Sequence, residues 1–121
     1  MNTRSMKILF VVALVAAVAT PLFAHLKILK TVPATDSTIA TSPKQVEVWF
    51  DEAPDLKVSK MTLMGPAGAV KLGAPQVKDK SLFAAVQGNL ADGAYTTSWT
   101  SEGDDGHVQT GMFKFTVKSA Q

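Results

Sequence analysis

The chain has 121 residues, with 12 Lys and Arg, 10 Asp and Glu, two His and no Cys. This length suits a short leader followed by one domain, and it is too short for two domains of ordinary size. Without cysteine an exported form must be held by core packing, with any bound metal adding to that, and not by disulfides. The sequence also lacks a glycine-rich phosphate loop and a basic patch of the kind that binds nucleic acid.

Residues 1–24 have the three parts of a secretory signal peptide. A basic start precedes an unbroken apolar run over residues 8–19, and Pro21 ends that run before a small residue at the cleavage position. The run is short for a membrane span, which needs about 20 apolar residues. We predict cleavage after Ala24 and export of the remainder, with cleavage after Ala19 as the competing site.

Cleavage after Ala24 leaves residues 25–121 as one domain. The leader carries two of the 12 basic residues and no acidic ones, so ten Lys then balance ten Asp and Glu. The formal charge of the mature domain is therefore zero. The whole-chain charge of +2 belongs to the leader and does not point to an acidic partner.

Alternation of apolar and polar residues dominates the mature chain and predicts β-strands. The clearest strands cover residues 46–51, 94–101 and 112–117, and their alternating sets are Val46, Val48 and Phe50, then Tyr95, Thr97 and Trp99, then Phe113, Phe115 and Val117. Shorter strands are predicted over residues 26–31, 58–64, 69–72 and 82–86, with turn clusters between them, including residues 33–37. The spacing predicts an all-β sandwich of about seven strands.

His25 is the first candidate metal ligand. After cleavage at Ala24 it carries a free α-amine beside its imidazole, and the two nitrogens can close a six-membered ring on one metal ion. The amine has an ordinary pKa of about 7.7–8.0, so the metal must displace a proton. That cost favours Cu(II), which heads the divalent affinity order and accepts tetragonal nitrogen and oxygen ligands. The alternative is a histidine that falls at this junction by chance.

Asp105-Gly106-His107 is the second candidate, because residues two apart in an extended chain share a face. The pair offers a carboxylate oxygen and an imidazole nitrogen. With His25 this makes three nitrogens and one oxygen, a set that suits square-planar Cu(II). The motif also fits an ordinary acidic turn between two strands. Asp104 is a rival ligand, less well placed because it lies three residues before His107.

Other residues have weaker claims to a role. Met61 and Met64 are three apart on a predicted strand, so they point to opposite faces and suit core filling better than a Cu(I) site. Asp51 and Glu52 follow a predicted strand. They fit either a solvated strand end or a carboxylate that orients a metal-binding imidazole. No nucleophile–base constellation is apparent.

Several short motifs occur in a characteristic order: Ala24-His25-Leu26-Lys27, Thr31-Val32-Pro33-Ala34, Ser42-Pro43-Lys44, Val48-Trp49-Phe50-Asp51-Glu52, Gly93-Ala94-Tyr95, and Asp105-Gly106-His107 running to Phe115. Each motif is weak alone. In their order and spacing they resemble the CopC family of periplasmic copper-resistance proteins, also called the CopC/PcoC or YobA-like family. The resemblance covers nearly all of residues 24–118.

The resemblance implies a Greek-key β-sandwich or barrel of cupredoxin- or immunoglobulin-like appearance. It implies that residues 25–121 form a monomeric periplasmic domain that binds one Cu(II) through His25, Asp105 and His107. It also implies a CopD-type inner-membrane protein as the recipient of copper. The Met-rich, His-containing segment that some members use for Cu(I) is missing here.

Two alternatives remain open on the sequence. One is a copper enzyme with a histidine brace, as in lytic polysaccharide monooxygenases, although an Asp ligand would occupy the position that oxygen needs. The other is a metal-free interaction domain with an immunoglobulin-like fold.

Overall fold

The segments in which apolar and polar residues alternate form β-strands. Each strand directs one row of its side chains into a core shared by the two sheets. A computed structural model describes residues 26–103 and 106–119. One sheet contains β1 (Ile28–Val32), β3 (Gln45–Phe50), β6 (Gln76–Lys78) and β7 (Ser81–Ala85). The other contains β2 (Ser37–Ile39), β4 (Lys60–Gly65), β5 (Gly68–Val70), β8 (Gly93–Glu102) and β9 (Val108–Val117).

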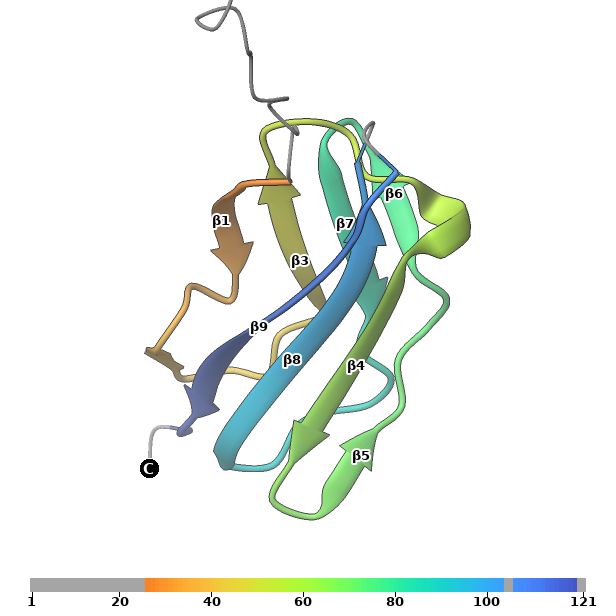
Figure 1. Ribbon diagram of the computed structural model, residues 1–121. Coiled ribbons are helices and arrows are strands. Elements are labelled where there is room, and N and C mark those ends of the chain that lie inside the picture. The colour runs from red at the N-terminus through yellow and green to blue at the C-terminus, as the bar shows by residue number, and fades with distance from the viewer. Residues whose placement is uncertain (1–25, 104–105, 120–121) are drawn as a thin grey trace, which may run out of the picture.

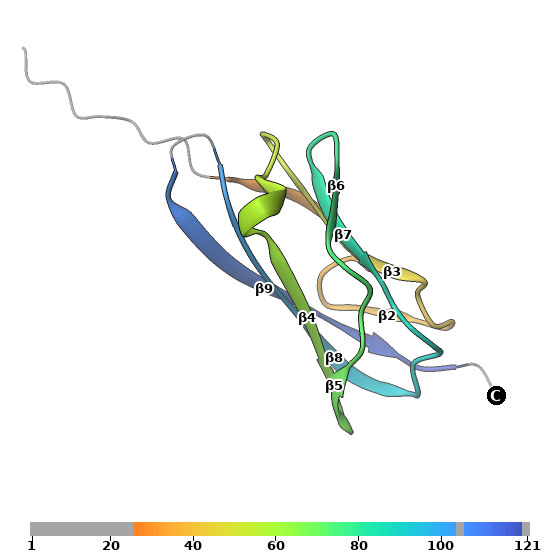
Figure 2. The same cartoon turned by 90° about the vertical axis from the view of Figure 1, so that its right-hand side faces the viewer.

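The two sheets pack face to face as a sandwich (Figures 1 and 2). Their strand orders are β1-β3-β7-β6 and β2-β9-β8-β4-β5. All pairings are antiparallel except that of β2 with β9, which is parallel. A short 3-10 helix, η2 (Leu56–Val58), connects β3 to β4, with the Asp55 side chain accepting from the Lys57 N–H at its start. In the described part of the chain, no helix is long and apolar enough to cross a membrane.

The structure confirms the predicted all-β sandwich. Nine strands occur in the described residues, where about seven were expected. The two additional strands, β2 and β6, are three residues long and are defined by backbone pairing with β9 and β7, so they leave little apolar pattern in the sequence. One of them begins at Ser37, inside the segment predicted as a turn. The strand predicted from residue 58 begins at Lys60, because η2 occupies the preceding residues.

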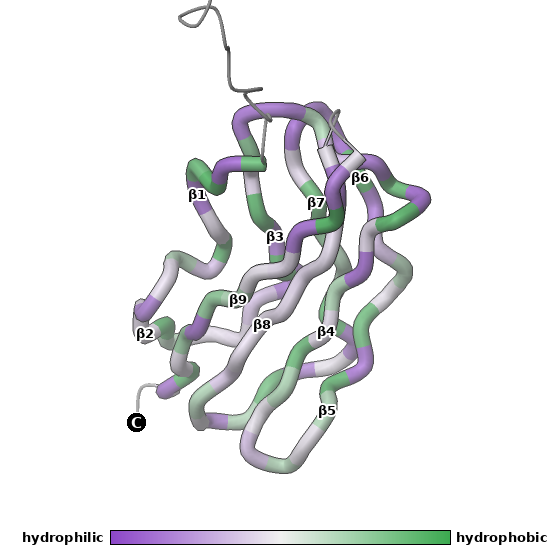
Figure 3. The backbone as a smooth tube through the Cα atoms, viewed as in Figure 1, coloured by the Kyte–Doolittle hydropathy of each residue, from purple (hydrophilic) through white to green (hydrophobic). Residues whose placement is uncertain are grey.

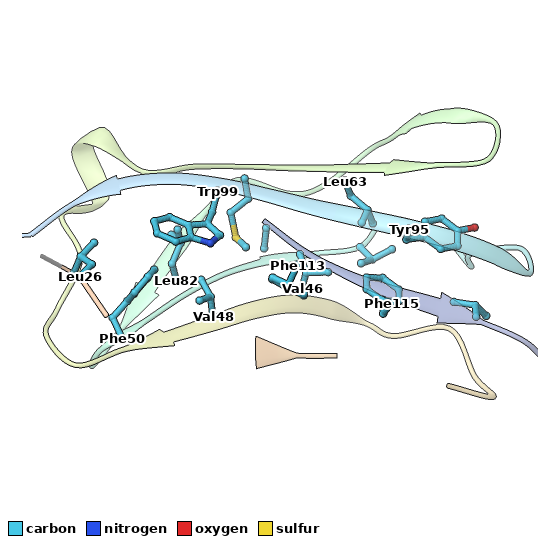
Figure 4. Close-up of a cluster of buried hydrophobic side chains, with 14 residues drawn as sticks. Leu26, Val46, Val48, Phe50, Leu63, Leu82, Tyr95, Trp99, Phe113 and Phe115 are labelled. Atoms are coloured by element: carbon cyan, nitrogen blue, oxygen red, sulfur yellow. The ribbon is translucent and has the colours of Figure 1, made fainter. Parts of the chain in front are cut away.

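The core is formed by the predicted alternating sets. All nine of those side chains are buried, together with Leu26, Met61, Leu63, Leu82, Ala84 and Val86. The rings of Phe50 and Trp99 meet edge to face with centroids 4.9 Å apart, and those of Tyr95 and Phe115 stack at 5.5 Å. Figure 4 shows that Leu26 and Phe50 lie at one end of this core and Tyr95 at the other.

The Trp99 ring lies close to Gly111 of β9, its partner in the register. A methyl group at Gly111 would come within 2.5 Å of the Trp99 ring atom Cζ2 and 2.8 Å of its Nε1. The Trp99 indole nitrogen is buried and has no hydrogen-bond partner among the described residues. The ring is therefore held by packing, and the space at Gly111 is what admits it.

We predict that Gly111→Ala destabilises the protein by about 1–3 kcal/mol, because the added methyl must push the Trp99 ring out of its packed position. Urea unfolding followed by Trp fluorescence measures the change. Met112→Ala, on the exposed face of the same strand, is the matched control and should stay within about 0.5 kcal/mol of wild type. Equal stability of Gly111→Ala and wild type would contradict the packing described here.

Asp92 holds the C-terminal end of β9 in place. Its Oδ1 accepts from the Ser119 hydroxyl at 2.5 Å and from the Ser119 N–H at 3.0 Å. These two bonds, the hydroxyl first, lower the pKa of Asp92 below its ordinary 3.8. The stabilising contribution of the carboxylate is therefore present above about pH 4 and is lost as the pH falls through the lowered pKa.

We predict that Ser119→Ala raises the Asp92 pKa toward 3.8 without reaching it, because the backbone bond remains. Carboxyl chemical shifts followed by NMR between pH 2 and 6 measure the pKa. Ser98→Ala, on the outer face of β8, should leave it unchanged. A pKa of 3.8 or above in the wild-type protein would refute the assignment.

Candidate metal centre

His107 lies in the connection between β8 and β9. This connection is at the end of the sandwich where β1 begins and β3 finishes (Figure 1). The last rung of the hairpin pairs Glu102 with Val108, and the Gly106 N–H donates to the Gly103 carbonyl at 3.1 Å. The His107 side chain is exposed, directly before the first residue of β9. The imidazole is thus accessible to a metal ion from solvent. Its backbone lies between the Gly106–Gly103 hydrogen bond and the first pair of β9.

The start of the described chain is tied to this same end by Gln109. The Leu26 N–H donates to the Gln109 Oε1 at 2.5 Å, and the Gln109 Nε2 donates to the Leu26 carbonyl at 3.5 Å. The Leu26 side chain is 5% exposed and belongs to the core. The residue that follows His25 in the sequence is therefore anchored to a strand residue only two positions beyond His107.

Lys27, the residue after Leu26, is hydrogen-bonded to the end of a strand in the opposite sheet. The Lys27 N–H donates to the Asp51 Oδ1 at 2.9 Å, and the Asp51 N–H donates to the Lys27 carbonyl at 3.0 Å. Asp51 directly follows β3, whereas Gln109 belongs to β9. Residues 26 and 27 thus cross the open end of the sandwich from one sheet to the other, and their direction is fixed at two consecutive residues.

Glu52 is packed against the start of the β8–β9 connection. A side chain at Gly103 would collide with the Glu52 Oε1 and would lie 3.3 Å from the Leu26 Cδ2. A side chain at Gly103 would make the Glu52 carboxylate shift, and this carboxylate lies at the same end of the sandwich as His107. The sequence predicts either a solvated strand end or an imidazole-orienting role for Glu52, and its position at this end is compatible with both.

Carboxylates from three segments gather at this end. Asp51 and Glu52 follow β3, Asp55 starts η2, and Glu102 ends β8; the Asp55 N–H donates to the Glu102 carbonyl at 3.0 Å. The loops here are mainly hydrophilic (Figure 3). Lys27, Lys57 and Lys80 lie at the same end, so the charge there is mixed. Within residues 26–103 and 106–119, no three His, Asp or Glu side chains are close enough to hold a metal ion by themselves.

The predicted ligand set lies only partly within the described residues. His107 is described and is placed as given above. His25, Asp105 and the rival Asp104 lie outside the described residues, so the predicted set of His25, Asp105 and His107 remains a prediction.

Sequence reasoning did not single out Gln109. The signal that could have revealed it is its position in the alternation of β9. It occupies an odd-numbered position, as do Phe113 and Phe115, which are buried, yet it is polar. A polar residue on the inward face of a strand needs a partner, and here the partner is the Leu26 backbone.

The methionines are dispersed. Met61 is buried in the core, as expected, whereas Met64 is 48% and Met112 is 62% exposed, so the prediction of core filling is wrong for Met64. Met64 pairs with Thr96 and Met112 with Ser98, which places them on the outer face of the sheet on opposite sides of β8. Thioether ligands for Cu(I) need to lie close together, and these three do not form such a cluster.

Comparisons with known proteins agree with one another. The CopC domain model matches residues 28–118. Copper resistance protein C of Escherichia coli is 33% identical over 116 residues, which cover 87% of this chain and 90% of the relative. Protein YobA of Escherichia coli strain K12 is 24% identical over 121 residues, covering 97% of this chain and 98% of the relative.

Solved structures show the same fold. The crystal structure of PcoC, described as a methionine-rich copper resistance protein from Escherichia coli, superposes with a TM-score of 0.68 at 30% identity. It covers 78% of this chain and 100% of PcoC. CopC from Methylosinus trichosporium OB3b superposes with a TM-score of 0.72 at 23% identity, covering 80% of this chain and 97% of that one.

We predict that Leu26→Ala destabilises the protein by about 2–4 kcal/mol, because it opens a cavity at the end of the core. Leu29→Ala is the matched control, since Leu29 is 62% exposed on β1, and its effect should stay within about 0.5 kcal/mol. Chemical denaturation of both variants measures the difference. Similar stability of the two would mean that residue 26 is not docked as described.

Proposed function

This chain belongs to the CopC family, and on that premise we propose that it is a periplasmic carrier of one Cu(II) ion per chain. The proposed ligands are the α-amine and imidazole of His25, a carboxylate oxygen of Asp105 and the imidazole of His107. The protein sequesters copper or passes it on, and it acts as a monomer.

The observation that carries the proposal is the anchoring of Leu26 beside the β8–β9 connection. The Cα atoms of consecutive residues are about 3.8 Å apart across a trans peptide bond. Leu26 is bonded to Gln109, and Gln109 is two residues from His107. The residue after His25 is therefore bonded to a residue two positions beyond His107, although His25 and His107 are 82 positions apart in the sequence.

The ligand chemistry supports Cu(II) over other cations. An amine, two imidazoles and a carboxylate suit the tetragonal geometry of Cu(II), and its high affinity for nitrogen offsets the cost of removing the amine proton. The dispersion of Met61, Met64 and Met112 gives no comparable support for a Cu(I) site.

The same ligand set supports a carrier over an oxidative enzyme. Three nitrogens and one carboxylate oxygen complete a square plane, which leaves no equatorial position for oxygen. We therefore assign no catalytic step to the protein. A CopD-type protein of the inner membrane is the proposed recipient, because the exported domain and such a protein would meet on the periplasmic side.

The proposal predicts that the chain beginning at His25 binds one Cu(II), with three nitrogen donors in its electron paramagnetic resonance spectrum. One alanine added before His25 should weaken binding by more than about a hundredfold, because it converts the amine into a peptide nitrogen. His107→Ala should have an effect of similar size. Loss of a residue that merely orients a ligand costs 10–100-fold, and loss of a ligand costs more.

Two controls accompany this titration. One alanine added after Gln121 tests for nonspecific effects of an extension, and Val108→Ala tests for disturbance of the hairpin, since Val108 is exposed beside His107. Both should bind copper like wild type. Undiminished binding by the N-terminally extended chain would contradict the amine chelate. Absence of binding by the wild type would favour a metal-free interaction domain, and reductant-dependent peroxide production would favour an enzyme.

A further inference from the structure

We propose that Gln109 is a positioning residue, which holds Leu26 beside the β8–β9 connection in the metal-free protein and so favours metal binding by the residue before it. This inference rests on the proposed function and deepens it. It names the group that prepares the first residue of the mature chain for metal binding, a role beyond the ligands themselves.

The Gln109 side chain makes two hydrogen bonds to the backbone of Leu26. The Gln109 carboxamide accepts from the Leu26 N–H at 2.5 Å and donates to the Leu26 carbonyl at 3.5 Å. The first bond is short and the second is at the outer limit of a hydrogen bond, so the N–H bond is the stronger of the two. Engaging both polar groups of one residue fixes its rotation as well as its position, as a rung of a β-ladder does.

The Gln109 carboxamide extends from a residue that is paired within the β8–β9 hairpin. Gln109 pairs with Ser101 across the β8–β9 hairpin, and the buried hydroxyl of Ser101 lies 2.7 Å from that of Ser59. The Gln109 side chain is itself half-buried, on the same face as Phe113. The group that holds Leu26 therefore stands on the longest pair of strands in the described residues.

A chain terminus needs such a restraint more than any other segment. The first residues of a domain are poorly ordered unless something ties them down. Without Gln109, the polar contacts that remain to the segment would begin at Lys27, bonded to Asp51. The first residue would then sample many positions relative to His107, and ordering it would reduce the net affinity for a metal ion that bridges the two.

The test compares three variants in the metal-free protein and with Cu(II). Gln109→Met keeps the length and packing of the side chain and removes both hydrogen bonds. Gln109→Glu keeps an oxygen that accepts from the Leu26 N–H. Gln87→Met, at an exposed position at the opposite end of the sandwich, is the matched control. Thermal unfolding checks that each variant folds, and Gln109→Thr replaces Gln109→Met if the latter does not.

Amide exchange by NMR and competition titration with Cu(II) are the two measurements. We expect the Leu26 amide to be protected in the metal-free wild type, in Gln109→Glu and in Gln87→Met. In Gln109→Met it should exchange at least about tenfold faster, and Cu(II) should bind roughly tenfold more weakly. A role in packing alone would leave Gln109→Met like wild type in both measurements.

Three results would overturn the inference: an unprotected Leu26 amide in the wild type, retained protection in Gln109→Met, or faster exchange in Gln109→Met with wild-type copper affinity. Failure of the proposed function looks different. In that case the wild type binds no copper, and the exchange measurement alone still decides whether Gln109 orders the N-terminal segment.

Discussion

The register of the β8–β9 hairpin is the constraint on which the rest of the structure depends. Ten residue pairs run without interruption from Gly93 with Val117 to Glu102 with Val108. If β9 slipped by one residue against β8, Phe113 and Phe115 would turn out of the core and their polar neighbours would turn in. The same register sets where His107 and Gln109 stand relative to Leu26. Core packing and the geometry of the proposed site are thus consequences of a single pairing.

Fold class and core could be predicted because alternation is a local property that burial reinforces. Each predicted set on β3, β8 and β9 combines aromatic or branched residues with polar neighbours, and no helical pattern competes with it. The short strands β2 and β6 could not be predicted in the same way. They exist because β9 and β7 offer backbone groups to pair with, and that information lies in segments distant in the sequence.

For the candidate site, only the carboxylate and imidazole residues could be predicted from the sequence. Their residue type alone indicates that they can bind a metal. The residues that bring those groups together are less conspicuous. Gln109 is neutral, and only its contact with the Leu26 backbone shows its role. Met64 was predicted to lie in the core because it is apolar and belongs to a strand. It lies on the outer face of the sheet, so residue type alone was misleading there.

The edges of the two sheets carry a further consequence. The outer strands are β1 and β6 in one sheet and β2 and β5 in the other. Three of these four are only three residues long, and β1 shifts its register between Ile28 and Lys30. Short or irregular edges offer few aligned backbone groups to a second chain. A cysteine-free sandwich built this way is protected against strand-to-strand aggregation by the shape of its borders, independently of charge and of any metal.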